Sequence, residues 1–255
     1  MSKLIDILRL VKNELLPPQK TEKDKELFRL QNLSRYTETN TTVLGNILRL
    51  PDTASFLFIY DEVFKKEIYR FKSDKQNPYI IDCGANIGLS AQYFARRFPR
   101  AKIIGVEPDT SNFSAAERHS AKFPQITIHN AAIGSQPGFV QIANEGVDAN
   151  AFQVVRTDTD GGVPVKTIPE IFTEIDDAEL FIVKIDIEGF ERDLFAENTD
   201  WIAYCDILIV ELHDWMLPGQ ASSLPFIKAI AAHQRDFLFK GESVFSFRND
   251  HLSQG

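Results

Sequence analysis

The amino-acid sequence predicts an α/β fold with a mostly parallel sheet of seven strands, of which the last runs antiparallel. Residues 79–83 form an apolar run that ends in a glycine turn, and apolar residues at helical spacing follow over 89–98. Four more apolar runs of this kind recur along the chain, at residues 101–107, 126–130, 179–189 and 204–213. Two short apolar runs around Gly241 and Glu242 then predict a closing hairpin.

Length and composition indicate a globular protein with one main core. The chain has 255 residues, of which 44% are hydrophobic, so it fits one α/β domain with additions. The net charge of -8 opposes non-specific attraction to phosphate backbones and to anionic lipid. We therefore expect a small-molecule or carbohydrate partner, and we expect no nucleic-acid partner.

Cysteine usage and hydropathy indicate the compartment. Cys83 and Cys205 both lie in apolar, strand-like runs, which favours buried reduced thiols. No run approaches the roughly twenty apolar residues that a membrane span needs. Charged residues interrupt the apolar positions of residues 1–16, which is unlike a signal peptide. We expect a cytoplasmic protein without stable membrane insertion.

The N-terminal region is predicted to form a helical extension or cap over residues 1–60, in front of a main domain at 61–255. Residues 1–16 carry apolar side chains at helical spacing and end at Pro17, which predicts an amphipathic helix. These apolar residues are Leu4, Leu8, Val11 and Leu15. We expect this helix to pack on the body of the protein or on a second subunit in a homo-oligomer. Lying on a membrane surface is the rarer alternative.

A segment rich in Phe and Leu precedes the first strand of the sheet. It includes a helix-like pattern over Asp61–Phe71, which we interpret as a lid on the substrate side. Glu67 or Tyr69 could reach a bound cofactor from there. Surface and packing roles are the alternatives for both residues.

The turn after residues 79–83 has the spacing of a nucleoside site. It reads Gly84-x-Asn86-x-Gly88, and Glu107 ends the next strand nineteen positions after Gly88, where a carboxylate can accept from both ribose hydroxyls. Asn86 stands where a dinucleotide fingerprint needs a glycine to approach a pyrophosphate. The turn therefore favours a nucleoside without a diphosphate, namely S-adenosylmethionine. A ligand-free strand-to-helix turn is the alternative.

The ends of the second and third strands supply further candidates for cofactor binding. Pro108 follows Glu107 directly, and Asp109 suits the N-cap of the next helix. The third strand ends at residues 130–132, beside the adenine in this architecture. Asn130, Ala131 and Ala132 could therefore contact the base, and a plain strand-to-turn transition is the alternative.

Charged residues gather along the fourth and fifth strands. Lys184, Asp186 and Glu188 alternate with apolar residues, so a strand would place all three on one face. Buried charges are costly unless they are paired or functional, and an ion pair of Lys184 that only stabilises the strand is the alternative. The fifth strand ends in Glu211 and His213, of which His213 could equally be an exposed loop residue.

Transfer of a methyl group to a hydroxyl needs alignment and removal of the hydroxyl proton. A neutral histidine with an unperturbed pKa of about 6.5 suits this role near neutral pH, so His213 is the first candidate base and Glu188 the second. A divalent metal held by Asp186, Glu188 and Glu211 could instead lower the pKa of the hydroxyl. The sequence leaves base and metal open.

Several sequence motifs together resemble those of the FkbM-type S-adenosylmethionine-dependent methyltransferases. They are Ile-Asp-Cys-Gly-Ala-Asn-Ile-Gly, Val-Glu-Pro-Asp, Asn-Ala-Ala-Ile-Gly, Val-Lys-Ile-Asp-Ile-Glu-Gly-Phe-Glu and Val-Glu-Leu-His, within residues 64–247. The resemblance implies a Rossmann-like class I methyltransferase domain at 61–255 that methylates hydroxyls of sugars, glycans or natural products. It implies cofactor contacts by Asp82, Gly84, Asn86, Gly88 and Glu107, and acceptor contacts by Lys184, Asp186, Glu188 and His213. Asp186 also borders the cofactor.

Other classes of protein remain open from the sequence. An NAD-dependent oxidoreductase or epimerase is disfavoured by Asn86 in the turn. A nucleic-acid methyltransferase is disfavoured by the acidic balance and by the absence of an Asn-Pro-Pro-Tyr-like motif after the fourth strand. A binding protein that keeps the cofactor fold without turnover is the last alternative.

Overall fold

The computed structural model describes residues 20–142, 154–158, 161–174 and 179–249 of the chain. The chain divides into two compact units, Met1–Leu57 and Phe58–Gly255. The helix expected over residues 1–16 and the loop expected over 144–150 lie outside the described residues.

The described part of the first unit contains a helix and a small antiparallel sheet. Helix α2 (Glu22–Gln31) begins with a capping box, in which Thr21 and Asp24 satisfy each other's backbone N–H groups. Strands β1 (Thr39–Thr41) and β2 (Leu48–Leu50) pair antiparallel. The prediction of a purely helical extension is therefore wrong for this part, because strands of three residues are too short for their periodicity to be read.

The second unit starts within α3 (Thr53–Tyr60), which continues into a π-helical turn, η1 (Asp61–Lys65). In this turn the Lys66 N–H donates to the Asp61 carbonyl over 2.8 Å. The helix expected over Asp61–Phe71 ends early, because Glu67 adopts a left-handed conformation with φ of 48°. The segment after Glu67 reaches β3 without regular structure.

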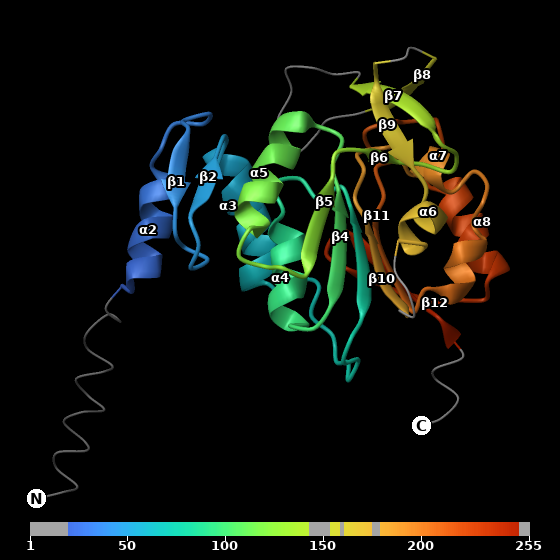
Figure 1. Cartoon of the computed structure of the whole chain (residues 1–255), viewed down its shortest axis with the longest axis horizontal. Coiled ribbons are helices and arrows are strands. Elements are labelled where there is room, and N and C mark those ends of the chain that lie inside the picture. The colour runs from blue at the N-terminus through green and yellow to red at the C-terminus, as the bar shows by residue number, and fades with distance from the viewer. Residues whose placement is uncertain (1–19, 143–153, 159–160, 175–178, 250–255) are drawn as a thin grey trace, which may run out of the picture. The chain divides into compact units, whose positions relative to one another are not determined.

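A seven-stranded, mostly parallel sheet forms the centre of the second unit, in the order β12-β13-β11-β10-β3-β4-β5 (Figure 1). Five neighbouring strands run parallel, and β13 runs antiparallel to both of its neighbours. The strand bounds are β3 (Tyr79–Cys83), β4 (Lys102–Val106), β5 (Ile126–His129), β10 (Leu180–Ile185), β11 (Ile207–Glu211), β12 (Asp236–Lys240) and β13 (Ser243–Phe247). The order doubles back at β3 and β10, so a crevice opens there at the carboxyl ends of the strands.

Helices cover both faces of this sheet (Figure 1). Helices α4 (Leu89–Arg97) and α5 (Thr110–Ser120) lie on one face. The other face carries α6 (Ile168–Phe172), α7 (Glu191–Leu194) and α8 (Leu224–Ala232), with the 3₁₀ turn η2 (Asp200–Tyr204) contributing to the same core. The sheet is thus buried on both sides, which explains why its strands are continuous apolar runs.

Alternation along β3 and β10 decides which side chains face which layer. Tyr79, Ile81 and Cys83 belong to the core on the α6–α8 side, whereas Ile80 belongs to the core on the α4 side. The two strands pair in register, with Asp82 opposite Lys184. Both charged residues therefore share the α4 side of the sheet.

A second, four-stranded sheet follows β5 in the order β6-β9-β7-β8. Its strands are β6 (Ala132–Ile133), β7 (Gly138–Ile142), β8 (Val154–Thr157) and β9 (Val163–Lys166). This is the inserted β excursion that turn residues and short apolar runs indicate in the sequence. Val140 and Val165 form its small core with Ala132.

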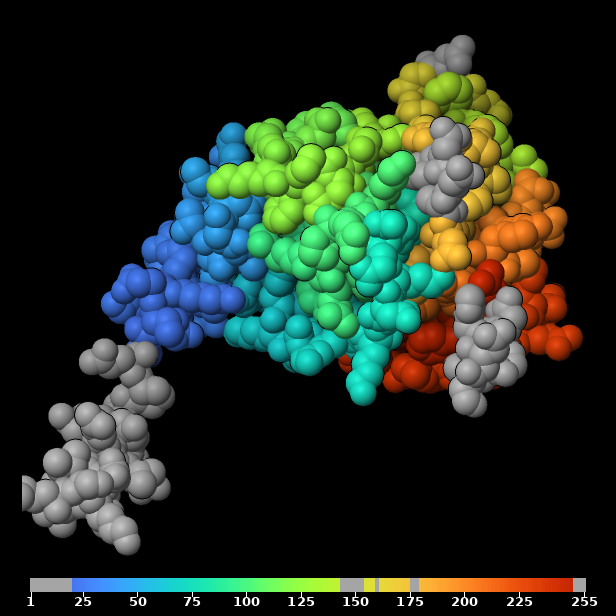
Figure 2. Space-filling view, turned by 60° about the horizontal axis from the view of Figure 1, so that its bottom comes forward, coloured from blue at the N-terminus to red at the C-terminus, as the bar shows by residue number. Residues whose placement is uncertain are grey.

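The closing hairpin packs back on the segment before β3. Figure 2 shows the C-terminal residues, in red, beside the cyan residues that precede β3, and here Lys240 donates to the carbonyls of Glu67 (2.7 Å) and Arg70 (3.1 Å). In α8, Phe226 and Ile230 are buried, whereas Ile227 is 49% exposed. Ser223 makes no capping hydrogen bond with its side chain.

Two predictions from composition can be compared directly with the structure. Cys83 and Cys205 are both free and buried, as their apolar surroundings predict. Among the described helices, none has the length and apolar character that crossing a bilayer requires.

Candidate active site

A cavity that is partly open to solvent lies at the carboxyl ends of β3, β4, β10 and β11. All of its lining residues belong to the second unit. They come from the turns that follow these strands, from the start of the small sheet, from η1 and from the closing hairpin. The crevice expected from the strand order is therefore a cavity in this molecule.

The glycine turn brings two strand ends into direct backbone contact. Gly84 has φ of 79°, and a Cβ atom added there would lie 1.8 Å from the carbonyl oxygen of Asp186. The Asp186 N–H also donates to the Cys83 carbonyl over 3.0 Å. Only glycine fits this position, because any side chain would push the two strand ends apart.

Glu107 connects the end of β4 to the glycine turn. Its Oε2 accepts from the Asn86 N–H (2.8 Å) and its Oε1 accepts from the Asp109 N–H (2.9 Å). The side chain lines the cavity although Glu107 is only 5% exposed. Burial raises the pKa of Glu107 to about 7, against the opposing effect of the two backbone hydrogen bonds.

Most of the residues predicted to bind a cofactor line this cavity together. They are Gly84, Asn86, Glu107, Pro108, Ala131, Ala132 and Asp186. Gly88 and Asn130 do not line it. Gly88 begins α4 and packs on Ala116, while Asn130 donates to the carbonyls of Glu107 (3.0 Å) and Pro108 (3.1 Å). Both support the backbone of the site from behind.

Asp82 is also predicted to contact the cofactor, but the structure places it beneath the cavity floor. It is completely buried, accepts from Ser90 Oγ, and its Oδ1 lies 3.2 Å from Lys184 Nζ. Lys184 in turn donates to the Gly84 carbonyl (3.1 Å) and lies 3.4 Å from Asp186 Oδ2. Asp82 therefore acts on the cavity through Lys184 and the glycine turn.

The charge of Lys184 is maintained inside the fold. Burial disfavours the charged form, but the carboxylates of Asp82 and Asp186 raise the pKa of Lys184 well above its usual value. The alternative reading of Lys184, an ion pair with Asp186, is thus present in the structure. Asp82 is an additional ion-pair partner of Lys184. Lys184 also lines the cavity floor.

The sequence predicts that one strand places Lys184, Asp186 and Glu188 on the same face, and this prediction is wrong beyond the end of β10. β10 ends at Ile185, and Glu188 has a left-handed φ of 52°. All three charged residues still line the cavity, but so does the intervening Ile187. The turn after β10, rather than the strand pleat, brings these side chains together.

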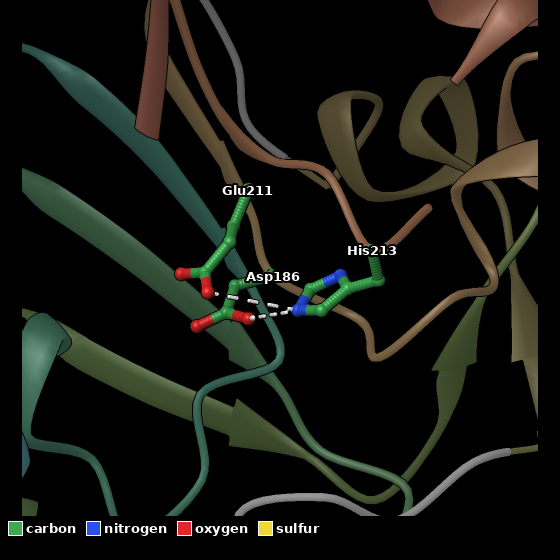
Figure 3. A group of neighbouring side chains, drawn as sticks. All are labelled: Asp186, Glu211 and His213. Carbon is green, nitrogen blue, oxygen red and sulfur yellow. Dashed lines mark ion pairs between the residues drawn. The ribbon is translucent and has the colours of Figure 1, made fainter. Parts of the chain in front are cut away.

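His213 lies beside four carboxylates, of which Figure 3 shows those of Asp186 and Glu211. Its Nδ1 lies 2.8 Å from Glu191 Oε1, and its Nε2 lies 3.7 Å from Asp186 Oδ1, 3.6 Å from Glu188 Oε2 and 3.7 Å from Glu211 Oε1. His213 is 2% exposed, so the alternative of an exposed loop histidine is wrong. We call these five residues the His213 cluster.

The protonation of the His213 cluster differs from the expectation of a neutral imidazole. Burial would lower the pKa of His213, but the hydrogen bond to Glu191 and the surrounding negative charges raise it to about 9. Burial, and then the charge of Asp186, raise the pKa of Glu188 to about 8 and of Glu211 to about 7. A pKa of about 9 disfavours the neutral imidazole that a histidine base requires near neutral pH.

The sequence missed several residues of the site. In the sequence analysis Glu191 is only the last residue of the motif Val-Lys-Ile-Asp-Ile-Glu-Gly-Phe-Glu. In the structure it is 1% exposed, and its Oε1 lies 2.8 Å from Nδ1 of His213. Glu242 and Ser243 line the cavity because β13 inserts beside β11, a pairing that no local pattern reports. Of the two lid residues, Tyr69 lines the cavity, whereas Glu67 does not.

Comparison with known protein families gives one match that covers more than half of the chain. The model described as the methyltransferase FkbM domain matches residues 82–239. This range contains the glycine turn, Glu107 and the whole His213 cluster.

Three known proteins are similar in sequence. The chain is 41% identical over 64 residues to methyltransferase sdnD of Sordaria araneosa, an alignment that covers 25% of each chain. It is 24% identical over 153 residues to hexuronic acid methyltransferase AglP of Haloferax volcanii, covering 59% of this chain and 62% of that protein. It is 21% identical over 187 residues to 2-O-methyltransferase NoeI of Sinorhizobium fredii, covering 64% and 77%. The chain thus spans a quarter of the first relative and less than two thirds of the second.

Among solved structures, the FkbM methyltransferase of Methylobacillus flagellatus superposes with a TM-score of 0.47 at 20% identity. The superposition covers 72% of this chain and 46% of that chain.

Proposed function

Because this chain belongs to the FkbM methyltransferase family, we propose that it transfers a methyl group from S-adenosylmethionine to a hydroxyl of a sugar, glycan or natural product. The observation that carries the proposal is the position of Glu107, which lines the cavity beside the glycine turn with both oxygens fixed by backbone N–H groups. A carboxylate held in this way keeps lone pairs free to accept from the two hydroxyls of a ribose.

The cavity walls fit the remainder of that cofactor. Ala131, Ala132 and Ile133 offer a small apolar surface for a purine on one side of Glu107, and Pro108 follows it directly. The absence of a side chain at Gly84 lets the ends of β3 and β10 approach each other closely, and Gly84 and Asp186 both line the cavity. Asn86 occupies the position at which a dinucleotide-binding turn has a glycine, which agrees with a nucleoside ligand that has no diphosphate.

Bound S-adenosylmethionine supplies a methyl group on a positively charged sulfur. At the acceptor end, the chain supplies Lys184, Asp186, Glu188 and Glu211, which line the same cavity. We assign the role of proton acceptor for the acceptor hydroxyl to Glu188, because it lines the cavity and because burial raises its pKa to about 8, which makes its ionised form a stronger base than an ordinary carboxylate and favours turnover at mildly alkaline pH. Glu188 therefore takes the place of His213 as the first candidate base, and His213 lies beside these carboxylates with its Nε2 3.6–3.7 Å from three of them.

The acceptor class is supported by the relatives and by charge. AglP is named for a hexuronic acid and NoeI for 2-O-methylation, which favours a sugar hydroxyl as the acceptor. A nucleic-acid acceptor is disfavoured by the net charge of -8 and by the carboxylates around the cavity. The family match favours a methyltransferase over the nicotinamide-dependent alternative.

Calorimetry with S-adenosylhomocysteine tests the cofactor site. We expect micromolar binding by the wild-type protein, at least tenfold weaker binding by Glu107→Ala, and unchanged binding by Glu117→Ala, since Glu117 is exposed on α5. Equal affinities of the Glu107→Ala and wild-type proteins would refute the cofactor site.

A panel of acceptors with free hydroxyls tests the reaction. Transfer of labelled methyl groups should depend on an acceptor hydroxyl, and Glu188→Gln should lower kcat about 10²-fold or more with unchanged S-adenosylhomocysteine affinity. Methyl transfer to nitrogen only, or full activity of Glu188→Gln, would contradict the proposal.

A further inference from the structure

The His213 cluster contains donor atoms at the separations that one metal ion imposes. The Nε2 of His213 lies 3.7 Å from Asp186 Oδ1 and 3.7 Å from Glu211 Oε1, and the three donor atoms all lie within 4.8 Å of one another (Figure 3). Two ligands that each lie about 2.1 Å from one ion are separated by roughly 3.0 to 4.2 Å, depending on the angle between them. The separations from His213 fall within this range.

The same separations are too long for hydrogen bonds. An imidazolium N–H that donates to a carboxylate normally approaches it to about 2.7–2.9 Å. Nε2 approaches none of its three carboxylates closer than 3.6 Å, and within the described part of the chain no acceptor forms a hydrogen bond with it. A ring that is 2% exposed therefore directs a nitrogen without a hydrogen-bond partner into the cluster.

The other ring nitrogen is held in the way that histidine ligands usually are. Nδ1 lies 2.8 Å from Glu191 Oε1, and Glu191 is 1% exposed. A carboxylate that accepts from one ring nitrogen fixes the orientation of the imidazole and makes the other nitrogen a better ligand. This contact is independent of the acidic residues that face Nε2.

The charge balance of the cluster also favours a cation. Asp186, Glu188, Glu191 and Glu211 all lie around one histidine. Lys184 is the neighbouring cation, but it lies 3.2 Å from Asp82 and donates to the Gly84 carbonyl, so its charge is shared with the strand beneath. Buried carboxylates at this density are stabilised by a cation between them.

We propose that Asp186, Glu211 and His213 bind a divalent cation of the Mn²⁺ or Mg²⁺ class at the part of the cavity wall that Asp186 and Glu211 line, with His213 losing its Nε2 proton when the ion binds. Carboxylates are the ligands that these ions prefer, and one imidazole nitrogen moves the preference toward Mn²⁺. Three protein ligands leave coordination positions for water and for the acceptor hydroxyl, because octahedral ions take six ligands.

This inference rests on the proposed function for its role in the reaction. A hydroxyl that coordinates the ion loses its proton more readily, and the carboxylate of Glu188 receives that proton. The oxygen then forms a bond to the methyl carbon while the carbon–sulfur bond breaks, and the electron pair of that bond stays on sulfur. The ion is neither consumed nor oxidised.

Electron paramagnetic resonance with Mn²⁺ alone tests the site, because the signal of hexaaqua Mn²⁺ falls as the ion binds. We expect saturable binding of one ion by the wild-type protein with a dissociation constant of about 10⁻⁵–10⁻⁴ M. Glu211→Gln should weaken Mn²⁺ binding about 10- to 100-fold, which is the usual effect of changing residues at or around a metal site. The matched control is Glu242→Gln, which removes the same charge from the cavity wall outside the cluster and should change the affinity less than about threefold.

Calorimetry with S-adenosylhomocysteine on the same samples separates the two proposals. Retained binding of this nucleoside by Glu211→Gln shows that the variant is folded, so lost Mn²⁺ affinity then supports the ion site. If the wild-type protein leaves the Mn²⁺ signal unchanged up to about 1 mM, or if Glu211→Gln and wild type bind equally, the ion site is refuted and the imidazolium alone holds the carboxylates. If the wild-type protein does not bind S-adenosylhomocysteine, the proposed function is refuted instead.

Discussion

The Nδ1 atom of His213 lies 2.8 Å from Oε1 of Glu191, and both side chains are almost completely buried. This contact connects the second residue after β11 with the first residue of α7. It fixes the imidazole ring so that Nε2 faces the carboxylates of the cavity. The orientation of the whole cluster therefore depends on a residue that does not itself line the cavity.

We predict that Glu191→Ala lowers both stability and Mn²⁺ affinity. Its removal leaves the buried Nδ1 without a partner, which should cost about 1–3 kcal/mol of unfolding free energy. Loss of the orienting carboxylate should weaken Mn²⁺ binding about 10- to 100-fold. Urea unfolding and the Mn²⁺ resonance titration measure the two effects. Glu191→Gln keeps an acceptor oxygen and should recover most of the stability, and equal losses in both variants would contradict the orienting role.

A second prediction concerns the contact between the two strand ends. Gly84→Ala places a Cβ atom 1.8 Å from the Asp186 carbonyl oxygen, so the unfolding free energy should fall by about 3 kcal/mol or more. Gly219→Ala is the matched control, since Gly219 has a similar φ of 81° but no atom within 4 Å of the added Cβ. The control should lose only about 1 kcal/mol, for the left-handed backbone alone. Similar losses in both variants by urea unfolding would show that the close approach is unimportant.

The ion pair beneath the cavity can be tested with a double-mutant cycle. Lys184→Met leaves the buried carboxylate of Asp82 without its cation and should cost about 3–5 kcal/mol. Asp82→Asn keeps an oxygen that can accept from Ser90 and removes the charge. The double variant should therefore be more stable than Lys184→Met alone, by chemical denaturation. Additive losses would indicate that the two side chains do not interact energetically.

The pKa of Glu107 predicts the pH dependence of cofactor binding. Burial raises this pKa to about 7 in the free protein, and the ionised carboxylate accepts from ribose hydroxyls much more strongly than the protonated carboxyl group does. Binding therefore favours the ionised form, so the affinity should rise with pH and level off above the pKa of the free protein. Calorimetry with S-adenosylhomocysteine should show about a tenfold rise from about pH 6 to about pH 8.

Glu107→Gln supplies the control for this profile. Its amide does not titrate, so the affinity should be lower and nearly independent of pH over the same range. A slope that persists in Glu107→Gln would assign the titration to another group.

The sequence by itself determined the parallel strands, the glycine turn and the carboxylate at the end of the second strand. Local patterns suffice for these features, because apolar runs report burial on both faces of a sheet and glycine reports a backbone that tolerates no side chain. Gly84, Asn86 and Glu107 accordingly lie together on one cavity. The same patterns predicted that Lys184, Asp186 and Glu188 gather beside the strand ends, and all three line the cavity.

Only the tertiary structure decided what each charged residue does. Asp82 lies beneath the cavity because β3 and β10 pair in register and place it beside Lys184. The pKa of His213 is raised because a turn, a strand end and the start of α7 bring four carboxylates around it, and the pKa of a histidine depends on such neighbours rather than on its own sequence position. Charge interactions act through space over a few ångströms, so residues remote in the chain fix the chemistry of this site.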